Sequence, residues 1–127
     1  MNAVGSALYG TLTGGTALTA QLAGTGAVYN QQAPEGAALP YMVFSKAGGG
    51  PENIDPHDRR DLTYWIRAYA DSAKTAGAID GAASTILHRA TLTVTGYRTI
   101  WCVRETEFEM VENPPDGVPV YMAGAYY

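Results

Sequence analysis

The stretch Asp61-Leu-Thr-Tyr-Trp-Ile-Arg-Ala-Tyr69 decides the fold of this chain. Its residues alternate between two faces, which carry Leu62, Tyr64, Ile66 and Ala68 on one side and Thr63, Trp65, Arg67 and Tyr69 on the other. A period of two with aromatic and β-branched side chains predicts a β-strand. Because both faces carry large apolar groups, we expect this strand to lie inside a sheet that is covered on both sides.

A long helix is predicted directly after this strand, because the period changes beyond Asp71-Ser72. Apolar residues then recur at helical spacing, namely at Ala76, Ile79, Ala83, Ile86, Leu87 and Ala90. Ser72 is a suitable N-cap, since its hydroxyl oxygen can accept a hydrogen bond from a backbone N–H of the first turn. The strand and the helix together form the unit around which the remaining elements are arranged.

The residues before this unit predict two short helices and two brief strands. Apolar residues spaced by four indicate a helix that ends at Gly14-Gly15, and Thr16 is a suitable cap for a second helical segment that ends at Gly24. The strands are expected at 27–30 and 41–44, with Pro40 at the entry of the second one, where its missing N–H does least harm.

The segment from Ala47 to Arg60 is predicted to be a long flexible loop, because it begins with Ala-Gly-Gly-Gly-Pro. A loop of this length inside a compact domain is uncommon and is usually functional or mobile. Two interpretations are open. The segment is either an arm that orders against a partner or a tolerated surface insertion.

The residues after the helix predict three further strands. The first covers 91–95, Gly96 makes the turn into a longer strand at 97–111, and a Pro- and Gly-rich turn at 113–117 leads into the final strand at 118–125. The predicted fold is therefore α+β: a largely antiparallel sheet packed against one long helix, with short N-terminal helices. At 127 residues the chain is expected to form a single domain.

Composition excludes several classes of function. The formal net charge of −4 argues against a basic nucleic-acid-binding surface. Cys102 is the single cysteine, so no intramolecular disulfide is expected, which is consistent with folding in a reducing cytoplasm. The apolar N-terminal stretch has no charged residue before Glu35, and Gly and Thr interrupt it, so we expect neither a targeting segment nor a membrane span.

No catalytic or metal-binding pattern is present, so neither an enzyme nor a cofactor is predicted. His57 has several Asp neighbours, but the spacing matches no familiar metal-ligand pattern and favours a solvated polar loop. His88 near the helix end suits the helix dipole rather than catalysis. Cys102 within an apolar strand is expected to be a buried small hydrophobe. The glycines at 48–50 lack the Lys-Ser/Thr of a phosphate-binding loop.

The alternative to a catalytic or metal-binding site is an interface with other protein subunits. Glu105, Glu107 and Glu109 alternate along one strand face, which is either a solvent-facing edge or a subunit interface or pore lining that would repel DNA phosphates. Over 100–103 both faces are apolar, and a neighbouring subunit would supply the second cover and protect the sheet edges. The candidate interface residues are Trp65, Arg67, Trp101, Glu105, Glu107, Glu109, Tyr126 and Tyr127.

Several stretches, taken in order, carry a resemblance to a known family. They include Ala7-Leu-Tyr-Gly-Thr-Leu-Thr13, Val28-Tyr-Asn30, Ala33-Pro-Glu-Gly-Ala-Ala-Leu-Pro-Tyr-Met-Val43 and Leu62-Thr-Tyr-Trp-Ile-Arg-Ala-Tyr69, and the closing hairpin turns at 113–117. With them the chain resembles the tail-terminator, or tail-completion, proteins of long-tailed bacteriophages and related gene-transfer particles. The resemblance covers nearly the whole chain, apart from the segment 47–60 and the acidic run that begins at Glu105.

This resemblance implies a structural, ring-forming subunit of the virion. It implies a hexamer at the head-proximal end of the tail tube, which ends tube polymerisation, presents a surface to the head connector and lets DNA pass without specific binding. Assembly would occur in the host cytoplasm. Two alternatives remain open: a head–tail joining or minor tail protein of the same particle, and a small α+β enzyme or ligand-binding domain.

Overall fold

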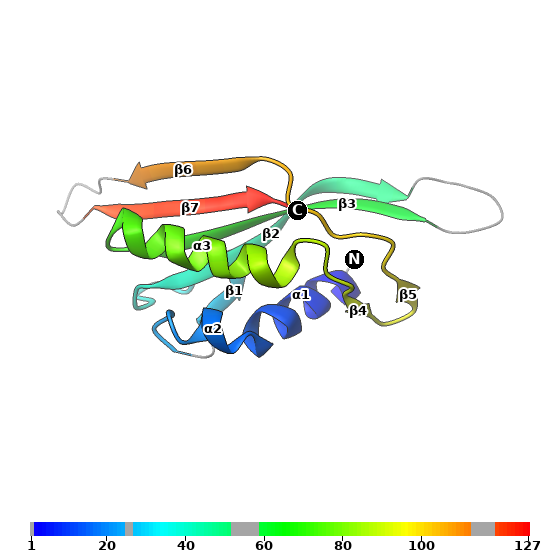
Figure 1. The fold of residues 1–127 in the computed structure, drawn as a ribbon, viewed down its shortest axis with the longest axis horizontal. Helices are drawn as coiled ribbons and strands as arrows, with labels where there is room; N and C mark the ends of the chain where they lie inside the picture. The colour runs from blue at the N-terminus through cyan, green and yellow to red at the C-terminus, as the bar shows by residue number, and fades with distance from the viewer. Residues whose placement is uncertain (1, 25–26, 52–58, 113–118) are drawn as a thin grey trace.

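The protein folds into a five-stranded β-sheet with three helices on one of its faces (Figure 1). This computed structural model describes residues 2–24, 27–51, 59–112 and 119–127. The strands lie in the order β1-β2-β3-β7-β6, and all neighbours are antiparallel except β1 and β2. The predicted α+β fold is confirmed. The strands of this sheet are β1 Val28–Asn30, β2 Tyr41–Pro51, β3 Arg60–Ala70, β6 Glu107–Glu112 and β7 Val120–Tyr126.

The central strand is β3, as its sequence pattern predicts, and it pairs with β2 on one side and β7 on the other. One of its faces is buried, with Tyr64, Ile66, Ala68 and Ala70 all under 7% exposed. The helix α3, Ala73–Leu87, packs on this face through Ile79, Ala83 and Leu87. Ser72 caps α3 as predicted: its side chain accepts a hydrogen bond from the backbone N–H of Thr75 at 3.2 Å.

The N-terminal helices α1, Asn2–Gly14, and α2, Thr16–Thr19, complete the cover of this face. They contribute Leu8, Leu12 and Leu18 to the same core as α3. The second predicted helix is shorter than expected, because the chain leaves the helix before Ala23, whose backbone N–H donates to the Pro40 carbonyl instead. Among the described helices, none has the length and hydrophobicity that crossing a bilayer requires.

The prediction of a loop that starts at Ala47 is wrong for its first five residues and for Arg60. β2 continues to Pro51 and pairs with the start of β3, after a register shift between Lys46 and Gly48. Glycine permits this pairing, since a Cβ at Gly49 (φ +99°) would lie 2.1 Å from the carbonyl oxygen of Asp61. The remainder of the predicted loop, with His57, lies outside the described residues.

The prediction of one strand over 97–111 is also wrong. A separate two-stranded hairpin forms from β4, Thr93–Val94, and β5, Tyr97–Arg98, and residues 99–106 are irregular before β6 begins. Around Cys102 the backbone bonds to the residues that follow α3, because Cys102 O accepts from Arg89 N at 2.6 Å, and pairing with β7 begins only at Glu105, whose N–H donates to Tyr126 O at 2.8 Å. Cys102 therefore does not lie in a strand. The predicted turn at 113–117 lies outside the described residues.

Within the described chain the sheet is covered on one side only, not on both sides as expected. All three described helices lie on one face, and no described segment covers the other. An antiparallel sheet can leave one face uncovered, whereas a parallel sheet with helical crossovers cannot. The large side chains of β3 on that second face are therefore only half-buried.

Candidate interaction surface

The helix-free face of the sheet carries a continuous set of large side chains. Strand register places every second residue of the antiparallel strands there, because directly opposed residues share a face. We call this set the aromatic face; it consists of Tyr41, Val43, Trp65, Arg67, Tyr69, Phe108, Met110, Met122 and Tyr126.

Aromatic rings pack against one another across the strands of this face. The centroid of the Trp65 ring lies 5.3 Å from that of Phe108 and 6.0 Å from that of Tyr126. Phe108 reaches Trp65 because Gly124 lies between them without a side chain, and a Cβ there would lie 2.9 Å from Phe108 Cζ. These distances match the favoured arrangements of aromatic pairs, which preorganise the surface.

A positive charge lies in the middle of the aromatic face. Arg67 Cζ is 4.0 Å from the centroid of the Trp65 ring and 5.9 Å from that of Tyr69, which are cation–π distances. In the described part of the chain, Arg67 Nε and Trp65 Nε1 are buried but have no hydrogen-bond partner. A buried donor without a partner costs about 1–3 kcal/mol, so both atoms favour a further acceptor.

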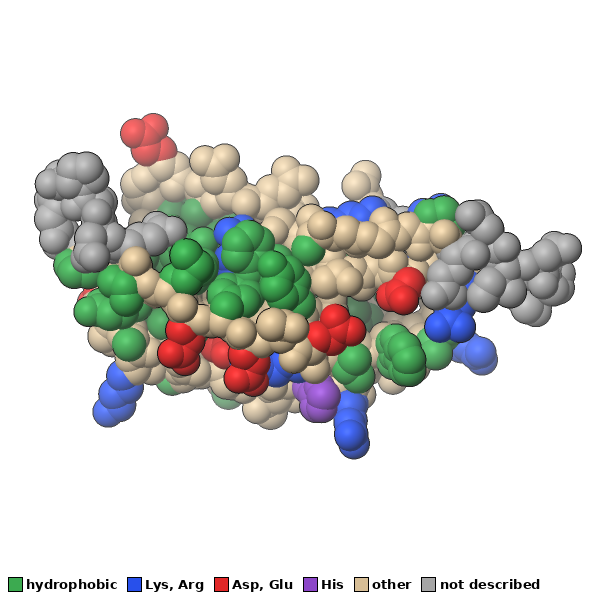
Figure 2. All heavy atoms as spheres, turned by 90° about the horizontal axis from the view of Figure 1, so that it is seen from above, with side chains coloured by type: hydrophobic (Ala, Val, Ile, Leu, Met, Phe, Trp, Pro, Cys, Tyr) green, Lys and Arg blue, Asp and Glu red, His purple; other side chains and the backbone are tan. Residues whose placement is uncertain are grey.

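The acidic side chains of β6 project toward the helix-covered side of the sheet, opposite the aromatic face. Glu107 and Glu109 pair with Ala125 and Ala123, which belong to the helix-covered face. We call Glu105, Glu107 and Glu109 the acidic edge, and all three are exposed. Figure 2, which looks down on β6, shows hydrophobic side chains gathered over this strand and acidic side chains in a row beside them, toward α3.

Arg104 ties the acidic edge to the core, a role that the sequence pattern does not signal. Its guanidinium donates to both carboxylate oxygens of Asp80, at 3.0 and 2.5 Å, and to Tyr127 Oη and Glu107 Oε1 at 2.8 Å each. The Asp80 carboxylate is the largest cause of a raised pKa at Arg104, which therefore stays charged. The backbone N–H of Arg104 donates to His88 Nδ1 at 3.0 Å. His88, which lies at the C-terminal end of α3 as predicted, therefore binds the segment that contains Arg104.

Tyr127 is buried within the chain, which argues against its predicted place at an exposed interface. Its side chain is 8% exposed and belongs to the core between α3 and the sheet. Burial raises the pKa of the Tyr127 hydroxyl, and the hydrogen bond from Arg104 acts in the opposite direction. Tyr126 points to the other face, because neighbouring residues of a strand alternate.

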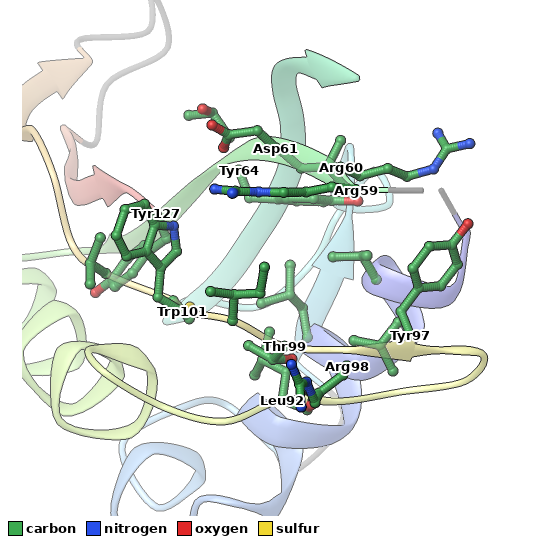
Figure 3. A pocket seen from close by; sticks show the side chains of 18 of the residues that line it. Arg59, Arg60, Asp61, Tyr64, Leu92, Tyr97, Arg98, Thr99, Trp101 and Tyr127 are labelled. Carbon is green, nitrogen blue, oxygen red and sulfur yellow. Dashed lines mark hydrogen bonds between the residues drawn. The ribbon is translucent and has the colours of Figure 1, made fainter. Parts of the chain in front are cut away.

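Trp101 borders a groove at the far end of the molecule (Figure 3). The groove has a volume of about 770 Å³ and lies between the start of β3, helix α1 and the irregular segment that follows β5. Trp101 and its neighbour Ile100 are 66% and 63% exposed. Figure 3 shows Arg60 and Asp61 on the β3 side of the groove, with Arg98 across from them.

The structure thus brings together only some of the predicted residues. Trp65, Arg67 and Tyr126 form one surface, whereas Trp101 and the acidic edge lie elsewhere. Phe108 also belongs to this surface but is not among the residues that the sequence predicts for it. Its alternation with Glu107 and Glu109 in the sequence is the signal that could have found it. Within the described residues there is no cluster of side chains that could hold a metal ion.

The fold and this surface define an α+β protein that presents an uncovered aromatic sheet face. The sequence matches the family described as tail completion protein gp17 over residues 6–116, and the chain belongs to this family. It is therefore a structural, tail-associated protein of a bacteriophage-type virion, and the predicted resemblance is confirmed.

A solved structure shares the fold. One chain in the virion of a native gene transfer agent particle superposes with a TM-score of 0.72 at 19% sequence identity. The match covers 95% of this chain and 89% of that chain. No curated protein sequence shows significant similarity to the chain.

Proposed function

We propose that the protein forms a hexameric ring that caps the head-proximal end of the tail tube. There it ends polymerisation of the tube and provides the joining surface for the head connector. The aromatic face is the observation that carries this proposal, because no described segment covers its half-buried rings and its two buried donors lack an acceptor within the described chain. Membership of the tail completion family supports the location in the tail.

A ring uses the aromatic face to join neighbouring copies. Protein oligomers are mostly closed and symmetric, and a contact between copies removes apolar surface from water. It also shields the sheet, because the outer strand β6 pairs only with β7 in the described part of the chain. The net charge of −4 suits a channel through which DNA passes without specific binding.

Contacts along the tail axis need a different surface, since the aromatic face is occupied in the ring. We assign this contact to the exposed pair Ile100 and Trp101, which is well suited to fill a pocket on a partner. The partner is the tail tube. Assembly takes place in the host cytoplasm, and the protein stays in the virion at the head-proximal end of the tail.

Electron microscopy of the purified protein mixed with tail tubes tests this function. We expect six-fold rings at one end of each tube and no further elongation when tube subunits are added. Rings that bind the head vertex and ignore tubes would overturn the capping role in favour of a head–tail joining protein. Absence of both rings and tube binding would overturn the proposal altogether.

A pair of alanine variants tests the tube contact. Trp101→Ala should still form rings but lose tube capping, because it removes the exposed indole and leaves the sheet intact. Tyr9→Ala is the matched control, since Tyr9 is 44% exposed on α1 and outside both surfaces. Equal capping by the two variants would show that Trp101 makes no tube contact.

A further inference from the structure

Covering the aromatic face also covers Arg67, so the partner must bring a negative charge. The guanidinium is half-buried between aromatic rings, and none of the ion pairs in the described residues involves it. Completing its burial without a carboxylate would remove a charge from water with nothing to compensate it. An apolar partner alone therefore does not fit this face.

The chain itself carries suitable carboxylates at the acidic edge. Glu105 and Glu109 are exposed, and neither has an ion pair within the described ranges. Glu107 differs because Arg104 already binds it. Glu109 lies on the outer strand β6, and Glu105 lies just before this strand, where its backbone N–H donates to Tyr126 O, so a neighbouring copy has access to both at the rim of the sheet.

The positions of the two charges decide the geometry of the contact. Arg67 projects from the helix-free face, whereas Glu109 projects from the helix-covered side of β6. A two-fold contact between two aromatic faces would place Arg67 of one copy near Arg67 of the other, and like charges repel. A head-to-tail contact instead sets the aromatic face of one copy against the acidic edge of the next, and such contacts close into rings.

We infer that Glu105 and Glu109 of each copy bind Arg67 on the aromatic face of the next copy, so that the ring closes head to tail. This inference rests on the proposed ring and adds which surfaces form it. Arginine suits the role because its planar guanidinium stacks on Trp65 while its terminal nitrogens donate to a carboxylate. The interface therefore joins two different surfaces of one chain.

Charge reversal with mixing of variants tests the inference. Arg67→Glu alone and the double variant Glu105→Lys/Glu109→Lys alone should each need at least roughly tenfold more protein to form rings, because the contact then joins like charges. A mixture of the two variants should restore rings at wild-type concentration, since a six-membered ring with alternating copies places unlike charges at every contact. Size-exclusion chromatography with light scattering measures the assembly.

Glu35→Lys is the matched control, because Glu35 is exposed in the loop before β2 and belongs to neither the aromatic face nor the acidic edge. It should form rings as the wild type does. Circular dichroism checks that each variant is folded. If Arg67→Glu does not fold, the double glutamate variant decides the matter by itself, since its substituted side chains are exposed and it must still fail to form rings.

Three results would overturn the inference. They are normal rings from Arg67→Glu, normal rings from the double glutamate variant, and a mixture of folded variants that does not recover. If the double glutamate variant forms normal rings but blocks DNA passage, the acidic edge belongs to the channel wall. Wild-type protein without rings would overturn the proposed function instead, so the two failures are distinguishable.

Discussion

Replacing Asp80 with alanine removes the carboxylate that holds Arg104 beneath the acidic edge. Two hydrogen bonds are lost, from Nη1 to Oδ1 at 3.0 Å and from Nη2 to Oδ2 at 2.5 Å. The side chains of Arg104 and Asp80 are 11% and 15% exposed, so water does not readily take the place of the carboxylate. Arg104 keeps its contacts with Tyr127 and Glu107.

Breaking a buried ion pair by removing one partner costs about 3–5 kcal/mol of unfolding free energy. Because Glu107 remains as a second anion, we expect the lower end, about 3 kcal/mol, for Asp80→Ala. For a chain of this size that corresponds to a fall in Tm of roughly 10 °C. Asp80→Ala is thus expected to be among the more destabilising single substitutions in the protein.

Urea unfolding at pH 7, followed by circular dichroism, measures the effect. Glu35→Ala is the control and should change the unfolding free energy by less than about 0.5 kcal/mol, since its side chain is exposed. Adding Arg104→Met to Asp80→Ala should recover part of the loss, because no charge is then left buried. A loss under about 1 kcal/mol for Asp80→Ala, or no recovery in the double variant, would refute the reasoning.

Three further outcomes are expected. Gly124→Ala should destabilise the protein by about 1–3 kcal/mol, because its Cβ would lie 2.3 Å from the carbonyl oxygen of Ile66. Gly77→Ala, on the exposed face of α3, should instead stabilise the protein by about 0.5–1 kcal/mol. Thermal melts compare the two variants. Cys102 should react with iodoacetamide at pH 8 roughly tenfold more slowly in native than in urea-unfolded protein, because burial raises the pKa of its thiol; equal rates would contradict this. Burial raises the pKa of Tyr127 above its ordinary value of 10.0. The neutral hydroxyl therefore contributes fully to the unfolding free energy below pH 10, and this contribution falls as pH rises through the folded-state pKa. Urea titrations from pH 8 to 11 should show a shallower decline of the unfolding free energy in Tyr127→Phe than in the wild type.

The parts of the fold that the sequence predicts correctly are those with a regular local pattern. The alternation over 61–69 and the helical spacing after Ser72 predict β3 and α3, because each face must be apolar where it meets the core. The glycine-rich continuation of β2 has no such pattern. It pairs with β3 through backbone hydrogen bonds, which any residue type can make, so its sequence resembles that of a loop.

The sequence indicates only part of the aromatic face, for a similar reason. The pattern over 61–69 places Trp65 and Arg67 on one face, because they alternate with core residues of one strand. Phe108 joins them only because Gly124 leaves room across an intervening strand. The sequence does not show that Tyr127 is buried, because one step beyond the end of β7 turns a side chain to the opposite face, where Tyr127 contacts Arg104 and the core.

The sequence by itself determined the fold class, the central strand, the capped helix and the family, since these depend on patterns within short stretches and on their order along the chain. Tertiary structure decided which face of the sheet the helices cover and that the apolar segment after β5 lies outside the sheet. It also decided that Arg67 and the acidic edge lie on opposite sides of the sheet. The physical reason is that these features depend on pairings between residues distant in the chain. Strand register and the packing of α3 select those pairings, and no local pattern encodes them.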